Sequence, residues 1–354
     1  MSDTVLVLAW LAFAHLVADF VLQTSNVARR KAGHGAQAVG GLLAHGVVVA
    51  ACLIPVVLAY GGPGWTFLAI VSVSHVLIDR TKVILTRRAA ATAIREARER
   101  HEGPQPPDHL GRAWTPQPAG LFLLDQAAHL AVSGWAWAVL LAGTPLTSSW
   151  TGAVDGLLGS WDRAAVHAVV GSLVVLTSLA ILNIRAASLF VGILVRPVEA
   201  GHDGEHRWGG RVAPAVAVSG VGPAPVAPGS RPPDRGRRWS IRIGPLAAQL
   251  TAEPEVTAPE PVTITAPPSV PDLGTSARVG STIGILERIL VVVFVLTGTD
   301  VAIGFVVAAK TLARFKLLDD RAFAEYYLLG TLASVAVAIV SALVGRAALG
   351  AILG

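Results

Sequence analysis

Charged residues are scarce in this sequence, and cysteine is nearly lacking. Of 354 residues, 14% are Asp, Glu, Lys or Arg, well below the roughly 25% of a typical soluble domain. A single cysteine, Cys52, excludes a disulfide scaffold. The sequence also lacks a Walker loop, a nucleophile elbow, zinc-finger cysteines and a dinucleotide fingerprint in a suitable context, so ATPase and oxidoreductase functions have no support.

Long apolar runs dominate instead. Hydrophobic residues make up 53% of the chain, and a bilayer core of about 30 Å is crossed by about 20 apolar residues in a helix. The sequence therefore predicts an all-α polytopic membrane protein with about eight transmembrane helices. They are expected at residues 4–23, 37–58, 65–85, 120–142, 164–194, 283–296, 301–315 and 323–349. The sixth and seventh are short and form a tight hairpin, and the first lacks signal-peptide flanks and should be retained.

The basic residues predict how these helices are oriented. Lys and Arg follow the first span at residues 29–31 and the third span at residues 86–118, whereas residues 60–64 and 143–162 contain none. Because basic loops stay in the cytoplasm, we expect these loops and the linker inside the cell and both termini outside. The basic residues behind the net charge of +5 therefore orient the membrane helices, and no nucleic-acid partner is expected.

Proline marks a break in the chain. Of the 22 prolines, 14 lie in residues 197–280, which predicts a disordered cytoplasmic linker. The expected domains are a five-span domain at 1–196, the linker at 197–280 and a three-span domain at 281–354. A basic run in the linker, Arg235 to Arg242 around Trp239, suits either contact with anionic lipid or a solubilising tether.

Ionisable residues recur inside four of the predicted spans. The first carries His15, Asp19 and Gln23, the second His45, the third His75, Asp79 and Lys82, and the fourth Asp125, Gln126 and His129. A spacing of four residues places His and Asp on one helical face. Because each ionisable group costs about 2.5 to 3.5 kcal/mol to insert, such groups normally face a bundle interior or water.

The depths of these residues agree between helices. At 1.5 Å per residue, the four histidines lie about 12 to 15 Å from the cytoplasmic ends of their spans, and the aspartates lie at about 6 to 9 Å. This predicts an imidazole layer above a carboxylate layer, with four helices around one polar interior.

Imidazole and carboxylate together are ligands for divalent transition metals such as Zn, Mn or Fe. The expected metal ligands are His15, His45, His75, His129, Asp19, Asp79 and Asp125. Any of the aspartates can act as general base or orient a histidine, Lys82 can hold an anionic substrate or neutralise Asp79, and Gln23 and Gln126 would support the site. The alternatives are interhelical hydrogen-bonded pairs or a proton or ion pathway.

Further polar residues lie in the later spans. We expect a C-terminal interfacial cluster of Glu287, Arg288, Lys310, Arg314 and Glu325 at the cytoplasmic surface, serving for pairing and anchoring or as a headgroup or partner site. Asn183 and Arg185 would lie deep in the fifth span, where one of them partners an aspartate unless the span boundary differs.

These motifs resemble a known bacterial membrane family, domain of unknown function 3307. The resemblance is carried by HLVADFVLQ from His15, LLAH ending at His45, HVLIDRTK from His75 and LLDQAAHL around Asp125, and by GILERILV and AEYYLLGTLAS in the last part of the chain. It implies that the polar interior is a family feature, and it supplies neither an activity nor a substrate.

Three classes of function fit these observations. The leading hypothesis is a metal-dependent intramembrane hydrolase acting on a lipid-linked substrate reached from the cytoplasm. The alternatives are a transporter of metal ions or protons and a non-catalytic membrane scaffold with a structural polar core.

Overall fold

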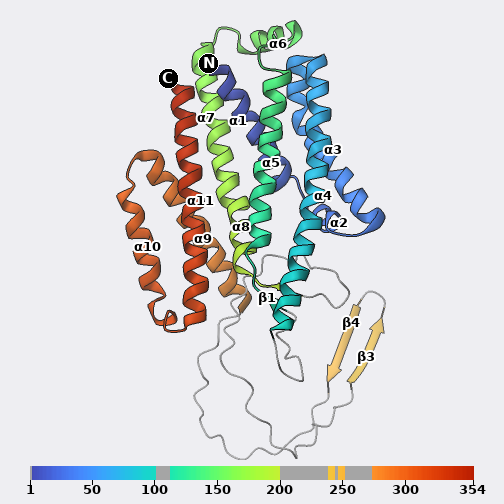
Figure 1. Ribbon diagram of the computed structural model, residues 1–354, viewed down its shortest axis with the longest axis vertical. Coiled ribbons are helices and arrows are strands. Elements are labelled where there is room, and N and C mark those ends of the chain that lie inside the picture. The colour runs from blue at the N-terminus through green and yellow to red at the C-terminus, as the bar shows by residue number, and fades with distance from the viewer. Residues whose placement is uncertain (1, 101–111, 200–237, 244–245, 252–272) are drawn as a thin grey trace, which may run out of the picture. The chain divides into compact units, whose positions relative to one another are not determined.

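The structure is a computed structural model and describes residues 2–100, 112–199, 238–243, 246–251 and 273–354. The chain divides into two compact units, one of Met1–Pro214 with Arg278–Gly354 and one of Ala215–Ala277. Long helices that run side by side make up the first unit (Figure 1). The predicted helical fold is therefore observed.

The first half of the chain contains α1 (Ser2–Leu16), a π-helical turn η1 (Val17–Val21), α2 (Ser25–Lys31), α3 (Gly35–Tyr60), α4 (Gly62–Glu99), α5 (Gln117–Leu140) and α6 (Ser148–Leu158). There follow α7 (Arg163–Ile181), a second π-helical turn η3 (Leu182–Ala186), α8 (Ala187–Val195), α9 (Leu273–Thr297), α10 (Val301–Ala313), a 3-10 turn η4 (Phe315–Leu317) and α11 (Arg321–Leu353). Strands β1 (Arg112–Ala113) and β2 (Val198–Glu199) pair antiparallel, as do β3 (Arg238–Ile243) and β4 (Leu246–Thr251).

Five helical segments of the described chain are long and apolar enough to cross a membrane. They are Thr4–Val21, Gly35–Tyr60, Arg163–Val195, Gly280–Thr297 and Phe323–Leu353. The predicted third and fourth spans lie in the helices α4 and α5, which are not among these five segments and carry most of the ionisable residues of the polar interior. The predicted seventh span corresponds to α10, which is shorter than a span. The structure thus supports five of the eight predicted spans by length and composition.

The predicted linker is described only in part. The hairpin β3–β4 contains part of the basic run around Trp239, and α9 begins at Leu273, earlier than the predicted sixth span. The remaining linker residues, for which disorder is predicted, lie outside the described residues. Helices α2 and α6 formed where loops were expected.

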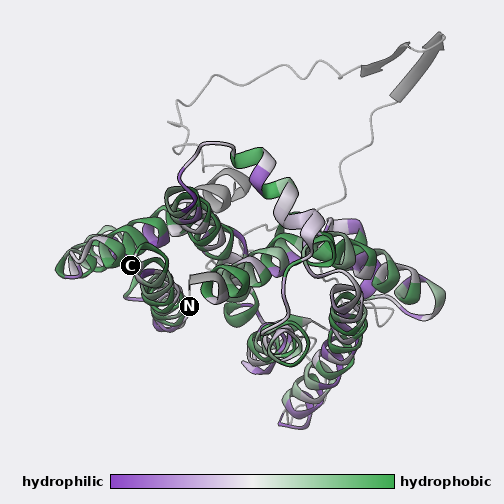
Figure 2. Ribbon diagram, turned by 90° about the horizontal axis from the view of Figure 1, so that it is seen from above, coloured by the Kyte–Doolittle hydropathy of each residue, from purple (hydrophilic) through white to green (hydrophobic). Residues whose placement is uncertain are grey.

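Apolar side chains cover the outside of the helices as well as the core. Val47 on α3 and Leu77 on α4 are 69% and 62% exposed, close in sequence to the buried His45 and His75. Green, hydrophobic ribbon accordingly covers most of the helices (Figure 2). Apolar exteriors around a polar interior are compatible with a membrane protein, because lipid rather than water would contact the outer face.

Two glycines bring α3 and α4 together. Gly61 has a φ of +63° and joins the two helices directly, a conformation that glycine adopts without steric cost. A Cβ added to Gly46 would lie 2.9 Å from Val76 Cγ2. The glycine therefore permits the close approach that places His45 beside His75.

Residues 281–354, which were predicted as a separate membrane domain, lie in the same compact unit as residues 1–196. An apolar core shared by α7, α9 and α11 contains Val175 and Leu179 of α7, Val291 and Val295 of α9, and Ala338 of α11. Both chain termini lie at the same end of this unit (Figure 1).

Candidate metal centre

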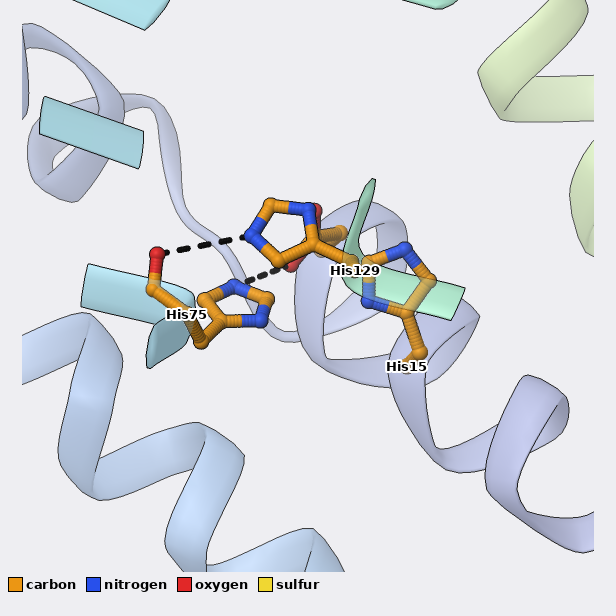
Figure 3. Close-up of side chains that lie close together, drawn as sticks. His15, His75 and His129 are labelled. Atoms are coloured by element: carbon orange, nitrogen blue, oxygen red, sulfur yellow. Dashed lines mark hydrogen bonds and ion pairs between the residues drawn. The ribbon is translucent and has the colours of Figure 1, made fainter. Parts of the chain in front are cut away.

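Four histidines from four helices meet inside the first unit. The ring centroids of His75 and His129 are 3.8 Å apart, those of His45 and His75 5.0 Å, and those of His15 and His129 5.1 Å. Figure 3 shows His15, His75 and His129 next to one another. All four side chains are buried, with His45 fully inaccessible. The structure therefore brings together the histidines that the sequence placed at one depth.

The tightest group consists of three ligand atoms from three elements. His45 Nε2 lies 3.0 Å from His75 Nε2 and 3.1 Å from Asp19 Oδ1, and His75 Nε2 lies 3.2 Å from the same oxygen. A second carboxylate is near, since Asp79 Oδ2 is 3.6 Å from His45 Nε2 and 3.8 Å from His75 Nε2. Two imidazoles and two carboxylates thus converge.

A π-helical turn positions Asp19. The amide N–H of Leu22 donates to the carbonyl oxygen of Val17 at 2.9 Å, five residues back, where an α-helix would bond four residues back. The π turn separates Asp19 from the regular α1 helix that carries His15. Single π turns of this kind often occur at functional sites. Gln23 lies beyond this turn, because the helical segment ends at Val21, so its four-residue spacing from Asp19 does not place it on the helical face of His15.

Two lysine side chains form ion pairs with the carboxylates of Asp79 and Asp125. Lys31 Nζ lies 2.5 Å from Asp79 Oδ2 and donates to Gln23 Oε1 at 2.7 Å. Lys82 Nζ donates to Asp125 Oδ2 at 2.6 Å. Lys82 was expected beside Asp79, so the structure corrects this pairing.

Lys31 is the residue of this site that the sequence analysis missed. It was assigned to a cytoplasmic loop, yet it is 7% exposed. The short helix α2 folds against α3 at Gly41, where an added Cβ would lie 2.5 Å from the Lys31 backbone nitrogen. The glycine pair Gly40-Gly41 was a signal of close approach, although it does not indicate which helix approaches.

Gln126 connects His15 with Asp125. It lies 3.1 Å from His15 Nε2 through Oε1 and donates from Nε2 to Asp125 Oδ2 at 2.9 Å. His129 Nε2 lies 3.4 Å from the carbonyl oxygen of His75, as Figure 3 shows, and His129 Nδ1 lies 3.9 Å from Asp125 Oδ1. His129 Nδ1 and Asp125 Oδ1 are buried without a hydrogen-bond partner in the described structure.

The ligand atoms fit a transition-metal ion geometrically. Metal–ligand bonds of about 2.0 to 2.1 Å at tetrahedral or octahedral angles separate ligand atoms by about 2.9 to 3.4 Å. The 3.0 to 3.2 Å separations among His45, His75 and Asp19 agree with this spacing. Three overlapping groups are close enough to hold an ion: His15 with Asp19, His75 and His129; His45 with His75 and Asp79; and Asp79 with Asp125 and His129.

The predicted C-terminal interfacial cluster is only partly observed. Lys310 Nζ pairs with Glu287 Oε2 at 2.5 Å, Glu325 pairs with Arg321, and Arg314 lies over the Tyr327 ring. Arg288 is an exception, because it is 4% exposed and buried between helices. The Arg288 side chain faces the protein interior, whereas the predicted position of the cluster at the cytoplasmic surface stays a prediction.

Asn183 also has partners other than those considered from the sequence. Its Nδ2 donates to Ser341 Oγ at 3.1 Å, and its carbonyl oxygen accepts from Arg288 Nε at 2.7 Å. Asn183 and Arg185 lie in the π-helical turn η3. In the described structure Asn183 therefore belongs to a second polar group and does not partner an aspartate.

The fold and the buried cluster define a predominantly helical protein with membrane-compatible helices and an ionisable interior. Residues 7–155 match the model of a protein family described as "Protein of unknown function (DUF3307)". This confirms the resemblance over the segment that contains the whole His/Asp cluster. No curated protein matches the chain, and no solved structure does.

Proposed function

We propose that this chain is a polytopic membrane protein whose buried cluster binds a divalent transition metal and hydrolyses a lipid-linked substrate. The observation that supports it best is the set of three ligand atoms of His45, His75 and Asp19, separated by 3.0 to 3.2 Å. In the proposed site these residues hold the ion, with Asp79 as a further ligand. Two imidazoles with carboxylates suit Zn, Mn or Fe.

The chain's own residues supply the other roles in this proposal. A bound ion would provide Lewis acidity toward water and toward a carbonyl or phosphoryl oxygen. Asp125 is the best candidate for general base, because Lys82 and Gln126 fix its Oδ2 while Oδ1 has no hydrogen-bond partner in the described structure. His129, 3.9 Å from that oxygen, can receive the proton.

A small cavity of about 10 Å³ adjoins the cluster. It is lined by Leu11, Ala14, Val49, Cys52, Leu53 and Val71, and it reaches His15, His75 and Ser133. A cavity of this size holds about one water molecule beside the histidines. In the proposal, a lipid-linked substrate therefore reaches the site only when the surrounding helices move apart.

The proposal includes the membrane topology. In it, all eight predicted spans cross the bilayer, and the charged faces of α4 and α5 point into the bundle. The basic end of α4 and the linker are cytoplasmic, and both termini are outside. The substrate then reaches the carboxylate layer from the cytoplasmic side.

Metal content of the purified full chain tests the proposal. We expect near-stoichiometric Zn, Mn or Fe by inductively coupled plasma mass spectrometry in the parent, and at least a tenfold loss in His75→Ala. The matched control is His167→Ala, because His167 is the fifth residue of α7 and lies outside the cluster. Equal metal in His75→Ala and the parent would overturn the metal site.

A second variant tests hydrolysis separately. Asp125→Asn should retain the metal but lose at least a hundredfold in hydrolysis of fluorogenic lipid ester and phosphodiester substrates. Retained metal with no hydrolysis in the parent, together with metal-dependent ion flux in proteoliposomes, would instead support transport. Retained cellular function in an Asp19→Asn and Asp125→Asn double variant would support a scaffold.

A further inference from the structure

Helix α2 brings Lys31 to a carboxylate of the His/Asp cluster. Lys31 Nζ lies 2.5 Å from Asp79 Oδ2. The same oxygen lies 3.6 Å from His45 Nε2 and 3.8 Å from His75 Nε2. Asp79 therefore presents one oxygen both to the lysine and to the two imidazoles that hold the ion in the proposed metal centre.

The charges of the cluster favour one cation at a time beside this oxygen. Its three aspartates, Asp19, Asp79 and Asp125, and its two lysines, Lys31 and Lys82, together carry −1 when the histidines are counted as neutral. A divalent ion changes this charge to +1, and withdrawal of Lys31 then returns it to 0. Because like charges repel strongly where water is excluded, binding of the ion would drive the ammonium group away from Asp79.

Besides its close backbone contact at Gly41, helix α2 is held by polar contacts. Arg87 of α4 donates to the carbonyl oxygens of Ala32 and Gly33, directly after the end of α2. None of residues 22–35 belongs to the three apolar cores of the described chain. A segment with few buried apolar contacts opens at a lower free energy than the rest of the fold, so α2 can move while the bundle stays packed.

We propose that Lys31 competes with the metal ion for Asp79 and that α2 is a lid that opens when the ion binds. This inference rests on the metal centre of the proposed function. In the closed form, which the structure shows, α2 covers the carboxylates, and the Asp79 side chain is 5% exposed. In the open form α2 moves about the non-helical residues 22–24 and 32–34 that flank it. Asp79 then binds the ion, and the cluster is uncovered for a substrate on the side of α2.

The rate of Lys31 acylation in the purified full chain tests the opening. The protein is stripped of metal with a chelator, and one half is reloaded with Zn. We expect acylation of Lys31, followed by peptide mass spectrometry, to be at least tenfold faster in the Zn-loaded half. Lys310 is the internal control, because it also forms an ion pair, with Glu287, but lies outside the cluster, so its acylation rate should be equal in both halves.

A variant without the ammonium group tests the competition. We expect Lys31→Met to bind Zn at least tenfold more tightly than the parent, measured by titration against a chelator. Lys310→Met is the matched control and should bind Zn like the parent. The acylation experiment uses only the parent chain, so the proposal stays testable if Lys31→Met does not fold.

The outcomes separate this inference from the proposed metal centre. Zn binding by the parent with equal Lys31 acylation in both halves would overturn the lid and leave the metal centre intact. Equal Zn affinity of the parent and a folded Lys31→Met would likewise overturn the competition alone. Zn binding by neither protein would overturn both proposals, whereas Zn binding by Lys31→Met alone would support the competition.

Discussion

Some residues of the polar interior stabilise it by neutralising a buried charge, and others offer atoms that could bind a metal ion. Lys31 and Asp79 illustrate this, because their side chains are 8% and 5% exposed and 2.5 Å apart. In a buried pair, removal of one partner leaves an uncompensated charge, which is usually more costly than removal of both. The stability of this pair is therefore a direct test of the arrangement around the candidate metal centre.

We expect Lys31→Met to lower the free energy of unfolding by about 3 to 5 kcal/mol, because Asp79 then remains buried and charged. Thermal unfolding in detergent measures the effect. The double variant Lys31→Met with Asp79→Asn should recover most of the loss. A single variant as stable as the parent would contradict the buried ion pair.

Histidines should differ in their effect on metal content. His45 Nε2 lies within 3.1 Å of both other atoms of the tight group, whereas His15 Nε2 contacts Gln126 at 3.1 Å. We therefore expect purified His45→Ala to contain at least tenfold less metal than purified His15→Ala, measured by mass spectrometry. The opposite order would show that the ion is held by the group containing His15 and His129.

Helices position these residues through close backbone approaches. The short helix α2 carries Lys31 and packs on α3 at Gly41, where an added Cβ would lie 2.5 Å from the Lys31 nitrogen and 2.8 Å from the Arg30 carbonyl carbon. Both neighbours are backbone atoms, which cannot move aside by a rotamer change. Any side chain at this position must displace α2.

Gly41→Ala should therefore destabilise the protein by about 1 to 3 kcal/mol, as overpacked interiors do, and should expose Lys31. Thermal unfolding and the rate of Lys31 acylation, followed by peptide mass spectrometry, measure the two effects. Gly40→Ala is the matched control, because no atom lies within 4 Å of the Cβ added there. Equal behaviour of the two variants would contradict the close contact between α2 and α3.

The sequence predicted the helices and most of the cluster for a physical reason. Ionisable residues in apolar spans normally face the interior of a helix bundle. Their spacing along each helix and their similar depths therefore predicted that His15, His45, His75 and His129 lie close together.

Other features depend on tertiary contacts that spacing does not encode. Lys31 is buried only because α2 folds back on α3. Arg288 was assigned to the interface from the charges around it, yet its acceptors come from α8, η3 and α11. The π-helical turns that position Asp19 and Asn183 have no periodic sequence signal.

At the scale of the whole molecule, the proposed topology makes a clear prediction about the two ends of the first unit. Helix α6 and both termini lie at one end, and the C-terminal part of α4 lies at the other (Figure 1). The proposed eight-span arrangement places the first end outside the cell. The apolar exterior of the helices between these ends then contacts lipid.

Single cysteines on a Cys52→Ser background test this topology with a membrane-impermeant maleimide. Thr151→Cys in α6 and Ala351→Cys near the C-terminus occupy exposed positions, as does Ala91→Cys in α4. We expect labelling of the first two in intact cells and labelling of Ala91→Cys only after permeabilisation. Because basic residues near α4 should remain cytoplasmic, labelling of Ala91→Cys and Ala351→Cys from the same side would contradict the eight-span arrangement and the cytoplasmic access proposed for the site.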